Sequence, residues 1–276
     1  MKAKIFVTRK IPKKGIDMLK KRFQVRVYPK DKVISRQELI KEVKWADGLL
    51  CLLTDKIDQK IISANPNLKV ISNYAVGYNN IDVKFATKKK IPVTNTPGVL
   101  TDAVAEHTLS LMLAIAKRIP EADRFVRKKK YKGWEPMLLL GTELQGKTLG
   151  IIGLGRIGFK VAERVAKGLG MKVLYYDLRK NIKFEKKVGA KKASISTILK
   201  KADFVSLHVP LLPSTTHLIG KKELGLMKKS AYLINTSRGP VVDEKALYKV
   251  LKQSGIAGAA LDVFEFEPKV VKGLDK

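Results

Sequence analysis

The feature that most constrains the fold is an apolar run at 148–152 that leads directly into three glycines at Gly-x-Gly-x-x-Gly spacing. These are Gly153, Gly155 and Gly158, and apolar residues at helical spacing follow over 161–169. Gly153 permits a tight turn from strand to helix, Gly155 lets backbone approach a bound phosphate closely, and Gly158 lets the helix pack against the strand. The helix N-terminus supplies free N–H groups and the positive end of a dipole. The pattern therefore predicts a strand–helix–strand unit with a phosphate site at its turn.

A second strand and an acidic residue extend this pattern. The run 172–176 is mostly apolar, and Asp177 follows it, nineteen residues after Gly158. A carboxylate at that distance accepts hydrogen bonds from both ribose hydroxyls of NAD. A glycine-rich turn in another α/β fold is the alternative, but the strand, the helix and the acid together favour a dinucleotide site. We therefore predict NAD as the cofactor, held by Gly153, Gly155, Gly158 and Asp177.

Composition places the chain among globular proteins and narrows its partners. Its 276 residues allow two ordinary domains, and no apolar run is long enough for a signal peptide or a membrane span. The lone cysteine, Cys51, lies in an apolar run and indicates a buried thiol in a reducing compartment, so we expect a cytoplasmic protein. The formal net charge of +31 attracts anions in general, but the lysines are spread along the chain without a nucleic-acid-reading motif. We expect no specific nucleic acid, no membrane and no metal among the partners.

Short apolar runs alternate with helical patterns nearly throughout, which favours parallel sheets with crossover helices. A turn cluster at 95–98 divides the chain. We therefore predict a smaller flavodoxin-like α/β substrate domain over 1–98 and a Rossmann-type doubly wound parallel sheet domain over 99–276, with ligands at the carboxyl ends of the strands. One long, well-buried helix is predicted over 101–118. The predicted strands cover 4–7, 25–28, 48–52, 69–72, 148–152, 172–176, 203–207, 231–234 and 257–261, and helices are predicted to begin near Pro12, Ser35, Asp58 and Asp82.

Three later segments stand at the ends of predicted strands, where catalytic residues belong: 206–211, 233–239 and 260–268. Three further motifs precede them in the chain, at 76–82, 95–98 and 153–158. Their residues and their order resemble those of the D-isomer-specific 2-hydroxyacid dehydrogenases, and the resemblance covers essentially the whole chain. The sequence is most similar to the glyoxylate/hydroxypyruvate reductase branch, with phosphoglycerate dehydrogenase as a near neighbour.

The resemblance implies reversible hydride transfer between NAD(H) and the C2 carbon of a small 2-oxo acid, with glyoxylate or hydroxypyruvate as the expected substrate. It implies that Arg238 fixes the substrate carboxylate and polarises the ketone, and that Glu267 holds a catalytic imidazole and raises its pKa. Backbone N–H groups around Val76 and Gly77 are implied to bind the same carboxylate. A homodimer is expected, because family members are usually dimers. The residues implied to line the cofactor, besides the three glycines, are Val76, Arg156, Ile157, Asp177, Val209, Thr236, Ser237 and Asp262.

Some of these residues allow simpler interpretations. Arg238 alone is also compatible with a surface arginine after a strand, and Asp262 with a cap on local backbone. Of the two neighbouring acids, the Glu-Pro pair favours Glu267 for the site and leaves Glu265 to solvent.

The family's catalytic histidine, which comes in a Pro-His pair downstream of the glutamate, has no counterpart in the sequence. The chain ends at Lys276, nine residues after Glu267, without the family's C-terminal closing segment. Of the three histidines, His107 is expected to be structural, His208 ends a strand, and His217 lies in a turn. We therefore expect slow hydride transfer from this chain, either truncated or naturally shortened. A 3-phosphoglycerate dehydrogenase and a non-catalytic NAD-responsive binding protein are the alternative functions.

Overall fold

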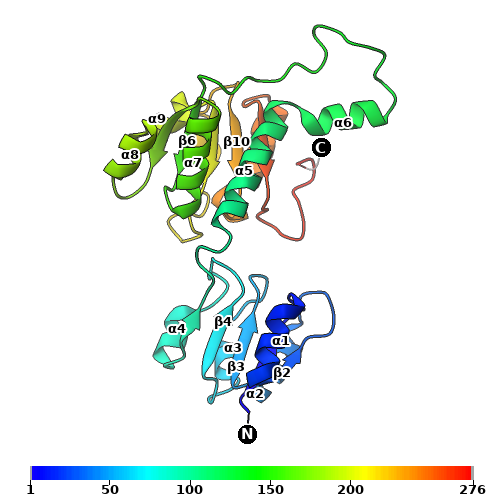
Figure 1. Cartoon of the computed structure of the whole chain (residues 1–276), viewed down its shortest axis with the longest axis vertical. Helices are drawn as coiled ribbons and strands as arrows, with labels where there is room; N and C mark the ends of the chain where they lie inside the picture. The colour runs from blue at the N-terminus through cyan, green and yellow to red at the C-terminus, as the bar shows by residue number, and fades with distance from the viewer. Residues whose placement is uncertain (1, 275–276) are drawn as a thin grey trace. The chain divides into compact units, whose positions relative to one another are not determined.

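The computed structural model describes residues 2–274 and divides into an N-terminal unit, Met1–Val99, and a C-terminal unit, Leu100–Lys276. Each unit is built on its own parallel sheet with crossover helices (Figure 1). Within residues 2–274, no helix combines the length and the apolar character that crossing a membrane requires.

The N-terminal sheet has five parallel strands in the order β2-β1-β3-β4-β5. This order is that of flavodoxin-like folds and confirms the α/β architecture predicted for the unit. The strands are β1 Lys4–Val7, β2 Gln24–Val27, β3 Gly48–Cys51, β4 Val70–Asn73 and β5 Val93–Thr94. Cys51 and Asn73 are paired in register at the carboxyl ends of β3 and β4, so the loops after these two strands begin side by side.

Polar caps set the starts of three helices in this unit. The side chains of Ser35, Asp58 and Asp82 each accept hydrogen bonds from N–H groups of the first helical turn, which satisfies donors that a helix start leaves unpaired. The helices are α1 Lys13–Arg22, α2 Arg36–Trp45, α3 Gln59–Ser63 and α4 Val83–Lys88. The apolar faces of α2, α3 and α4 pack on the sheet around Phe6 and Ile71, which are 2% and 0% exposed, whereas Ile16 of α1 packs with Val7.

The C-terminal sheet has six parallel strands in the order β11-β10-β9-β6-β7-β8. Counted from β8, this is the Rossmann order, and the winding direction reverses between β6 and β9. The predicted Rossmann-type domain is therefore confirmed. The strands are β6 Thr148–Ile152, β7 Lys172–Tyr176, β8 Lys191–Lys192, β9 Phe204–Leu207, β10 Tyr232–Asn235 and β11 Gly258–Leu261.

Helices cover both faces of this sheet. Ile151 packs with α5 and α7 on one face, and its neighbour Ile152 packs with α9, α10 and α11 on the other; Figure 1 shows α5 and α7 together on one face. The helices are α5 Thr101–Ala116, α6 Ile119–Arg127, α7 Arg156–Gly168, α8 Ile182–Val188, α9 Ile195–Lys201, α10 Lys221–Leu224 and α11 Glu244–Lys252, with a short 3₁₀ helix η1 Gly239–Val241. Successive residues of β6 thus point to opposite faces, as the alternation of a strand requires.

Helix α5 is less buried than the sequence predicted. Its buried residues are Ala105, Thr108, Met112 and Ala116, which form a single stripe at helical spacing. The larger apolar side chains outside this stripe are half-buried: Val104, Leu109, Leu111, Leu113 and Ile115. The helix ends at Ala116, before the predicted boundary, and Arg118 has a φ of 54°, outside the helical range.

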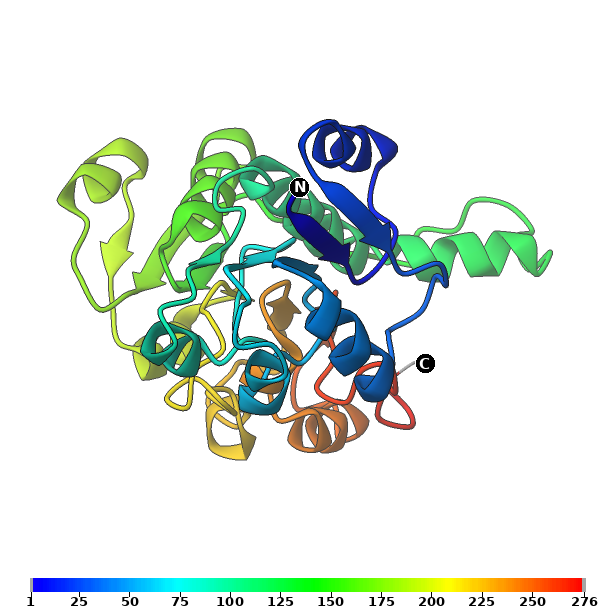
Figure 2. The same cartoon turned by 90° about the horizontal axis from the view of Figure 1, so that it is seen from below.

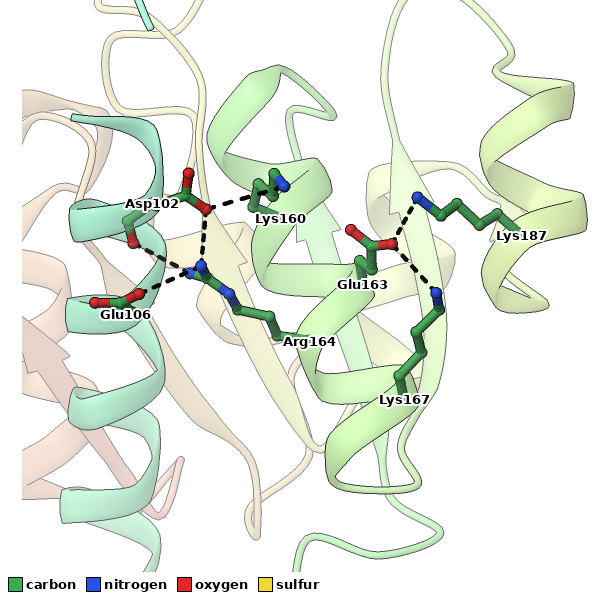
Figure 3. A network of polar contacts seen from close by, with 7 residues as sticks. All are labelled: Asp102, Glu106, Lys160, Glu163, Arg164, Lys167 and Lys187. Atoms are coloured by element: carbon green, nitrogen blue, oxygen red, sulfur yellow. Dashed lines mark hydrogen bonds and ion pairs between the residues drawn. The ribbon is translucent and has the colours of Figure 1, made fainter. Parts of the chain in front are cut away.

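Ion pairs connect α5, α7 and α8 along the surface (Figure 3). Arg164 of α7 lies 2.7 Å from Asp102 and 3.3 Å from Glu106, both on α5. Glu163 of α7 lies 2.7 Å from Lys187 of α8. Single exposed pairs of this kind contribute about 0–1 kcal/mol each, so the apolar core remains the main link between these helices.

Helix α6 and the loop after it project from the C-terminal sheet (Figure 1 and Figure 2). Helix α6 has no buried residue. Within residues 119–140, which we call the apolar arm, the exposed large apolar side chains are Ile119, Val126, Tyr131, Trp134, Met137 and Leu140. Trp134 is 81% exposed, so the arm presents apolar surface that this single chain does not cover.

Candidate functional site

The turn between β6 and α7 is built around glycines that nothing larger would replace without a clash. Gly153 has a φ of 97°, and a Cβ there would lie 2.6 Å from the carbonyl oxygen of His208. A Cβ on Gly158 would lie 2.3 Å from the carbonyl oxygen of Gly153. The turn and the first helical turn therefore pack directly on each other and on the end of β9.

Gly155 differs from these two glycines because a Cβ on it would meet no atom within 4 Å. It caps α7, and the first backbone hydrogen bond of the helix runs from the N–H of Phe159 to the carbonyl of Gly155. The N–H groups of Arg156, Ile157 and Gly158 therefore have no acceptor within the helix. Open space beside free N–H groups at a helix N-terminus is the geometry that holds phosphate.

Asp177 stands at the end of β7, next to this turn. Its Oδ2 accepts a hydrogen bond of 2.7 Å from the N–H of Leu154, and its Oδ1 accepts one of 3.4 Å from the N–H of Arg179. A cavity of about 380 Å³ lies beside it, lined by Leu154, Asp177, Arg179, Lys180, Asn181, Ile182 and Lys183. The carboxylate is thus fixed beside a cavity whose other charged lining residues are all basic.

The end of β9 brings His208 and Val209 against the glycine turn. The Nε2 of His208 lies 2.9 Å from the Oγ of Ser206. Burial lowers the pKa of His208 to about 4, so its imidazole is neutral at physiological pH. Val209 packs on Gly153, where its Cγ1 would lie 3.0 Å from an added Cβ. His208 is therefore no source of an imidazolium proton near neutrality.

The turn after β10 is held by a buried asparagine. The Oδ1 of Asn235 accepts hydrogen bonds from the N–H and the Oγ of Ser237, at 3.0 and 2.7 Å. Its Nδ2 donates to the carbonyl of Arg238 at 2.9 Å. Thr236 is fixed by a 2.9 Å hydrogen bond to Thr108 of α5. The backbone that carries Arg238 is therefore rigid on both sides of the residue.

Arg238 and Glu267 come from neighbouring strand ends. Burial lowers the pKa of Arg238, and the nearby Glu267 carboxylate acts in the opposite direction. The two loops meet closely at Gly239, where a Cβ would lie 2.0 Å from the backbone of Phe264. The Oε1 of Glu267 accepts a hydrogen bond of 2.8 Å from the N–H of Phe264. Arg238 is half-buried and Glu267 is exposed, so a cation and an anion lie near each other beyond the carboxyl ends of β10 and β11.

Glu265 is held by the protein, and the expectation that it faces solvent is wrong. Its side chain is 14% exposed, and its Oε1 lies 2.7 Å from the Nε2 of His217. Its Oε2 accepts a hydrogen bond of 3.3 Å from the N–H of Glu244, whose own Oε1 accepts one from the N–H of Glu265. The sequence could not reveal this arrangement, because the three residues are far apart in the chain.

Glu244 itself is 1% exposed. Among residues 2–274 its Oε2 is buried without a hydrogen-bond partner. Burial raises the pKa of Glu244, and the carboxylates of Glu265 and Glu267 add to that effect. This buried acid is a feature of the site that no sequence motif indicated.

Asp262, at the end of β11, has two contacts that bear on its role. Its N–H donates to the carbonyl of Asn235 at 3.0 Å, which continues the pairing of β10 and β11. Its Oδ1 lies 3.2 Å from the Nε2 of His107 on α5. Asp262 is exposed, and the pairing connects the end of β11 with α5.

In the N-terminal unit, Val76 and Gly77 lie in the loop that follows β4, and both are half-buried. The carbonyls of Val76 and Gly77 accept hydrogen bonds of 2.7 Å from the side chains of Asn95 and Asn73. The other predicted site residues all lie at the carboxyl ends of strands in the C-terminal unit.

Comparison with known proteins decides the family. A family model described as D-isomer specific 2-hydroxyacid dehydrogenase, NAD binding domain, matches residues 109–273. The chain belongs to this family. A glyoxylate reductase of Thermococcus litoralis is 52% identical over 97% of this chain and 82% of its own length.

Solved structures agree with the sequence comparison. The crystal structure of a protein from Thermus thermophilus matches with a TM-score of 0.90 and 40% identity, over 98% of this chain and 84% of that one. A D-lactate dehydrogenase from Aquifex aeolicus, complexed with NAD and lactic acid, matches with a TM-score of 0.85 and 34% identity, over 98% of this chain and 82% of that one. These findings confirm the resemblance drawn from the sequence. The C-terminal unit of this dehydrogenase is therefore an NAD-binding domain.

Sequence reasoning missed the asparagines and the buried acid of this dehydrogenase. Asn73, Asn95 and Asn235 each hold backbone groups of a strand-end loop through a side-chain amide. For Asn73 and Asn235, the available signal was an asparagine directly after a predicted strand, since asparagine side chains satisfy backbone groups of turns.

Proposed function

We propose that this protein uses NADH to reduce a small 2-oxo acid at its C2 carbon, with glyoxylate as the first substrate and hydroxypyruvate as the second. The observation that carries the proposal is the half-buried Arg238 guanidinium near Glu267. Arg238 and the glycine turn both follow the carboxyl ends of strands in the same sheet. The glyoxylate reductase of Thermococcus litoralis, at 52% identity, supports the choice of substrate.

Each side chain has a defined role in this proposal. Arg238 binds the carboxylate and polarises the keto oxygen, because its planar guanidinium can donate two parallel hydrogen bonds. Glu267 orients and charges an imidazole, and the N–H groups around Val76 and Gly77 bind the substrate carboxylate. The NAD contacts proposed are Val76, Gly153, Gly155, Arg156, Ile157, Gly158, Asp177, Val209, Thr236, Ser237 and Asp262.

We propose that none of the three histidines in this sequence is the proton donor. His208 is neutral near pH 7 because burial lowers its pKa to about 4. His107 and His217 are paired with Asp262 and Glu265. We therefore propose that the donor is an imidazole supplied by a Pro-His segment beyond Glu267, and that hydride transfer is slow without it.

The test is an assay of NADH oxidation with glyoxylate, hydroxypyruvate and 3-phosphohydroxypyruvate. The 276-residue chain is compared with one extended by a family-like tail that contains Pro-His. General acid catalysis contributes about 10²–10⁴-fold, and the extended chain should exceed the shorter one by that factor. Full turnover by the shorter chain would disprove the proposed donor. Absence of turnover from both chains with every oxo acid would favour an NAD-responsive binding protein instead.

We also propose a homodimer formed through the apolar arm and α5. The arm carries exposed apolar side chains, and only one stripe of α5 is buried; a second copy would cover such surface. Trp134→Glu should convert a dimer into a monomer in light scattering coupled to size-exclusion chromatography. Met18→Glu, at a residue that is 63% exposed on α1, is the control. A wild-type monomer would exclude this interface.

The proposed location is the cytoplasm. The lone thiol, Cys51, is buried, and burial raises its pKa to about 12. A protonated, buried cysteine fits a reducing compartment.

A further inference from the structure

Three consecutive carbonyls in the loop after β4 are tied down by neighbouring residues. The carbonyl of Ala75 accepts a hydrogen bond of 3.0 Å from the backbone N–H of Thr96. The next carbonyl, that of Val76, accepts one of 2.7 Å from the Nδ2 of Asn95. The third, that of Gly77, accepts one of 2.7 Å from the Nδ2 of Asn73. We call residues 74–78 the anchored loop.

Anchoring a carbonyl also sets the direction of the next N–H. A trans peptide is planar, so its C=O and the following N–H point in opposite directions. The N–H groups of Val76, Gly77 and Tyr78 therefore point away from the residues that hold the carbonyls. Within residues 2–274, none of these three N–H groups has a hydrogen-bond acceptor. The anchored loop thus presents three free donors in succession.

The anchors are themselves fixed by a buried polar network. Asn73 is 2% exposed, and its amide exchanges 3.3 Å hydrogen bonds with the amide of Asn80. The Nδ2 of Asn80 donates to the carbonyls of Leu52 and Asp55, at 3.0 and 3.1 Å. A fully paired buried network holds a single geometry, so the direction of the free donors is set by the interior of the unit.

We propose that Asn73 and Asn95 are positioning residues for the reaction, which aim the backbone N–H groups of Val76, Gly77 and Tyr78 at the carboxylate of the 2-oxo acid. This inference rests on the proposed function, which places the substrate carboxylate at this loop. The two side chains touch neither substrate nor cofactor, and they act by holding carbonyls on the side of the loop away from the carboxylate.

The expected effect is a loss of carboxylate affinity rather than a loss of chemistry. Removing an anchor lets its peptide unit rotate, and one net hydrogen bond is worth about fivefold to tenfold in an equilibrium constant. These contacts exist in the ground state and in the transition state alike, so KM should rise with little change in kcat. Affinity for NADH should not change.

The variants are Asn95→Ala and Asn73→Ala, with Asn65→Ala as the matched control. Asn65 is 8% exposed in the same unit, and its Nδ2 donates to the carbonyls of Val43 and Ala46 at 3.0 and 2.7 Å. Like Asn73, Asn65 is a buried residue whose side-chain amide holds backbone carbonyls. These carbonyls lie outside the anchored loop. Asn95 is only half-buried, so its variant tests the proposal even where Asn73→Ala does not fold.

Oxalate, a two-carbon carboxylate that cannot be reduced here, is titrated into the NAD-saturated 276-residue chain while backbone amide resonances are followed by NMR. In the wild type, oxalate should shift the resonances of Val76, Gly77 and Tyr78. Asn95→Ala should weaken oxalate binding about fivefold or more, whereas Asn65→Ala should bind like the wild type. Kd for NADH, from fluorescence, should be the same in all three proteins.

Three results would overturn the inference. Equal oxalate affinity in the wild type and in Asn95→Ala would remove the positioning role and leave the proposed function standing. Equal weakening in Asn65→Ala would mean that any lost amide loosens the unit. A wild type whose amides at 76–78 do not respond to saturating oxalate or glyoxylate would overturn both the inference and the placement of the substrate at this loop.

Discussion

Two strand-end turns, one in each unit, expose backbone N–H groups, and they do so by different means. After β6, the N–H groups belong to a helix start, and glycines allow the close packing of that start against β6 and β9. After β4, there is no helix start within the loop, and the side chains of Asn73 and Asn95 hold its carbonyls. The donors of the first turn are successive N–H groups of one helix start, whereas those of the second are directed by side chains that hold the neighbouring carbonyls.

This difference predicts how each turn responds to mutation. A glycine turn fails by steric clash, because an added Cβ meets backbone atoms that cannot move aside. An asparagine-anchored loop fails by loss of a hydrogen bond, which costs less than a clash at a half-buried anchor such as Asn95. A side chain added at the glycine turn should therefore lower the free energy of unfolding. Removal of an anchoring asparagine should instead lower the affinity for the ligand.

The largest expected effect is the loss of turnover on changing Arg238, in the turn after β10. Asn235 holds the backbone of this turn, as Asn73 holds the backbone of the anchored loop. Arg238→Lys keeps the positive charge but loses the planar guanidinium, which can donate two parallel hydrogen bonds to a carboxylate. Loss of a buried charge-assisted contact costs about 2–5 kcal/mol, so turnover of a chain with the Pro-His tail should fall by about 30-fold or more, with Kd for NADH little changed. A fully active Lys variant would exclude Arg238 as the carboxylate anchor.

Two glycines of the turn after β6, Gly158 and Gly155, test whether a steric clash lowers stability. A Cβ on Gly158 would lie 2.3 Å from the Gly153 carbonyl oxygen, whereas one on Gly155 meets nothing within 4 Å. Gly158→Ala should lose about 1–3 kcal/mol of unfolding free energy in chemical denaturation. Gly155→Ala should keep its stability and lose NADH affinity. Equal stability losses in the two variants would contradict this distinction.

A smaller effect is expected at Asp177, beside the same turn, on the preference for NADH over NADPH. Its carboxylate should repel a 2′-phosphate, so we expect Kd for NADH to be lower than Kd for NADPH by about tenfold. Arg179 and Lys180, which also line the cavity, oppose this preference. Asp177→Ser should reduce the ratio of the two constants. Tighter NADPH binding by the wild type would show that the two cations outweigh the carboxylate.

The smallest effect is a pH dependence at Glu244, whose pKa is raised by burial and by Glu265 and Glu267. A carboxyl with a raised folded-state pKa adds stability that is complete below its ordinary value of 4.5 and is lost as pH rises through the folded-state pKa. Glu244→Gln cannot ionise, so its unfolding free energy should gain on that of the wild type as pH increases. Parallel curves for the two proteins would contradict the prediction, and Glu135→Gln, at an exposed position, is the control.

Most strands were predicted to within one residue, because parallel strands leave a strong local pattern of apolar residues between turn residues. For example, 148–152 and 172–176 coincide with β6 and β7. The strands β5 and β8 were not predicted. Each has two residues, too few for periodicity to be visible, and each is a strand only because a longer neighbour pairs with it.

Burial was harder to predict than secondary structure. The apolar residues around α5 indicated a well-buried helix, but the unit fully buries only the stripe that includes Met112 and leaves Leu109, Leu111 and Leu113 half-buried. Glu265 was expected in solvent, but His217 and Glu244 hold it. In both cases the outcome depends on distant segments, which a local pattern does not contain.

The sequence by itself determined the family, the two sheet types and the glycine turn, since each of these leaves a pattern of residue types that can be read along the chain. Positive φ at Gly153 and a helix start at Arg156 follow from local geometry. The roles of the predicted site residues remain predictions. Only the tertiary structure decided which side chains hold the strand-end loops, because Asn95 reaches Val76, and Glu244 reaches Glu265, across about twenty residues of chain. Hydrogen bonds over such separations form only after the sheet has aligned the strands that carry them.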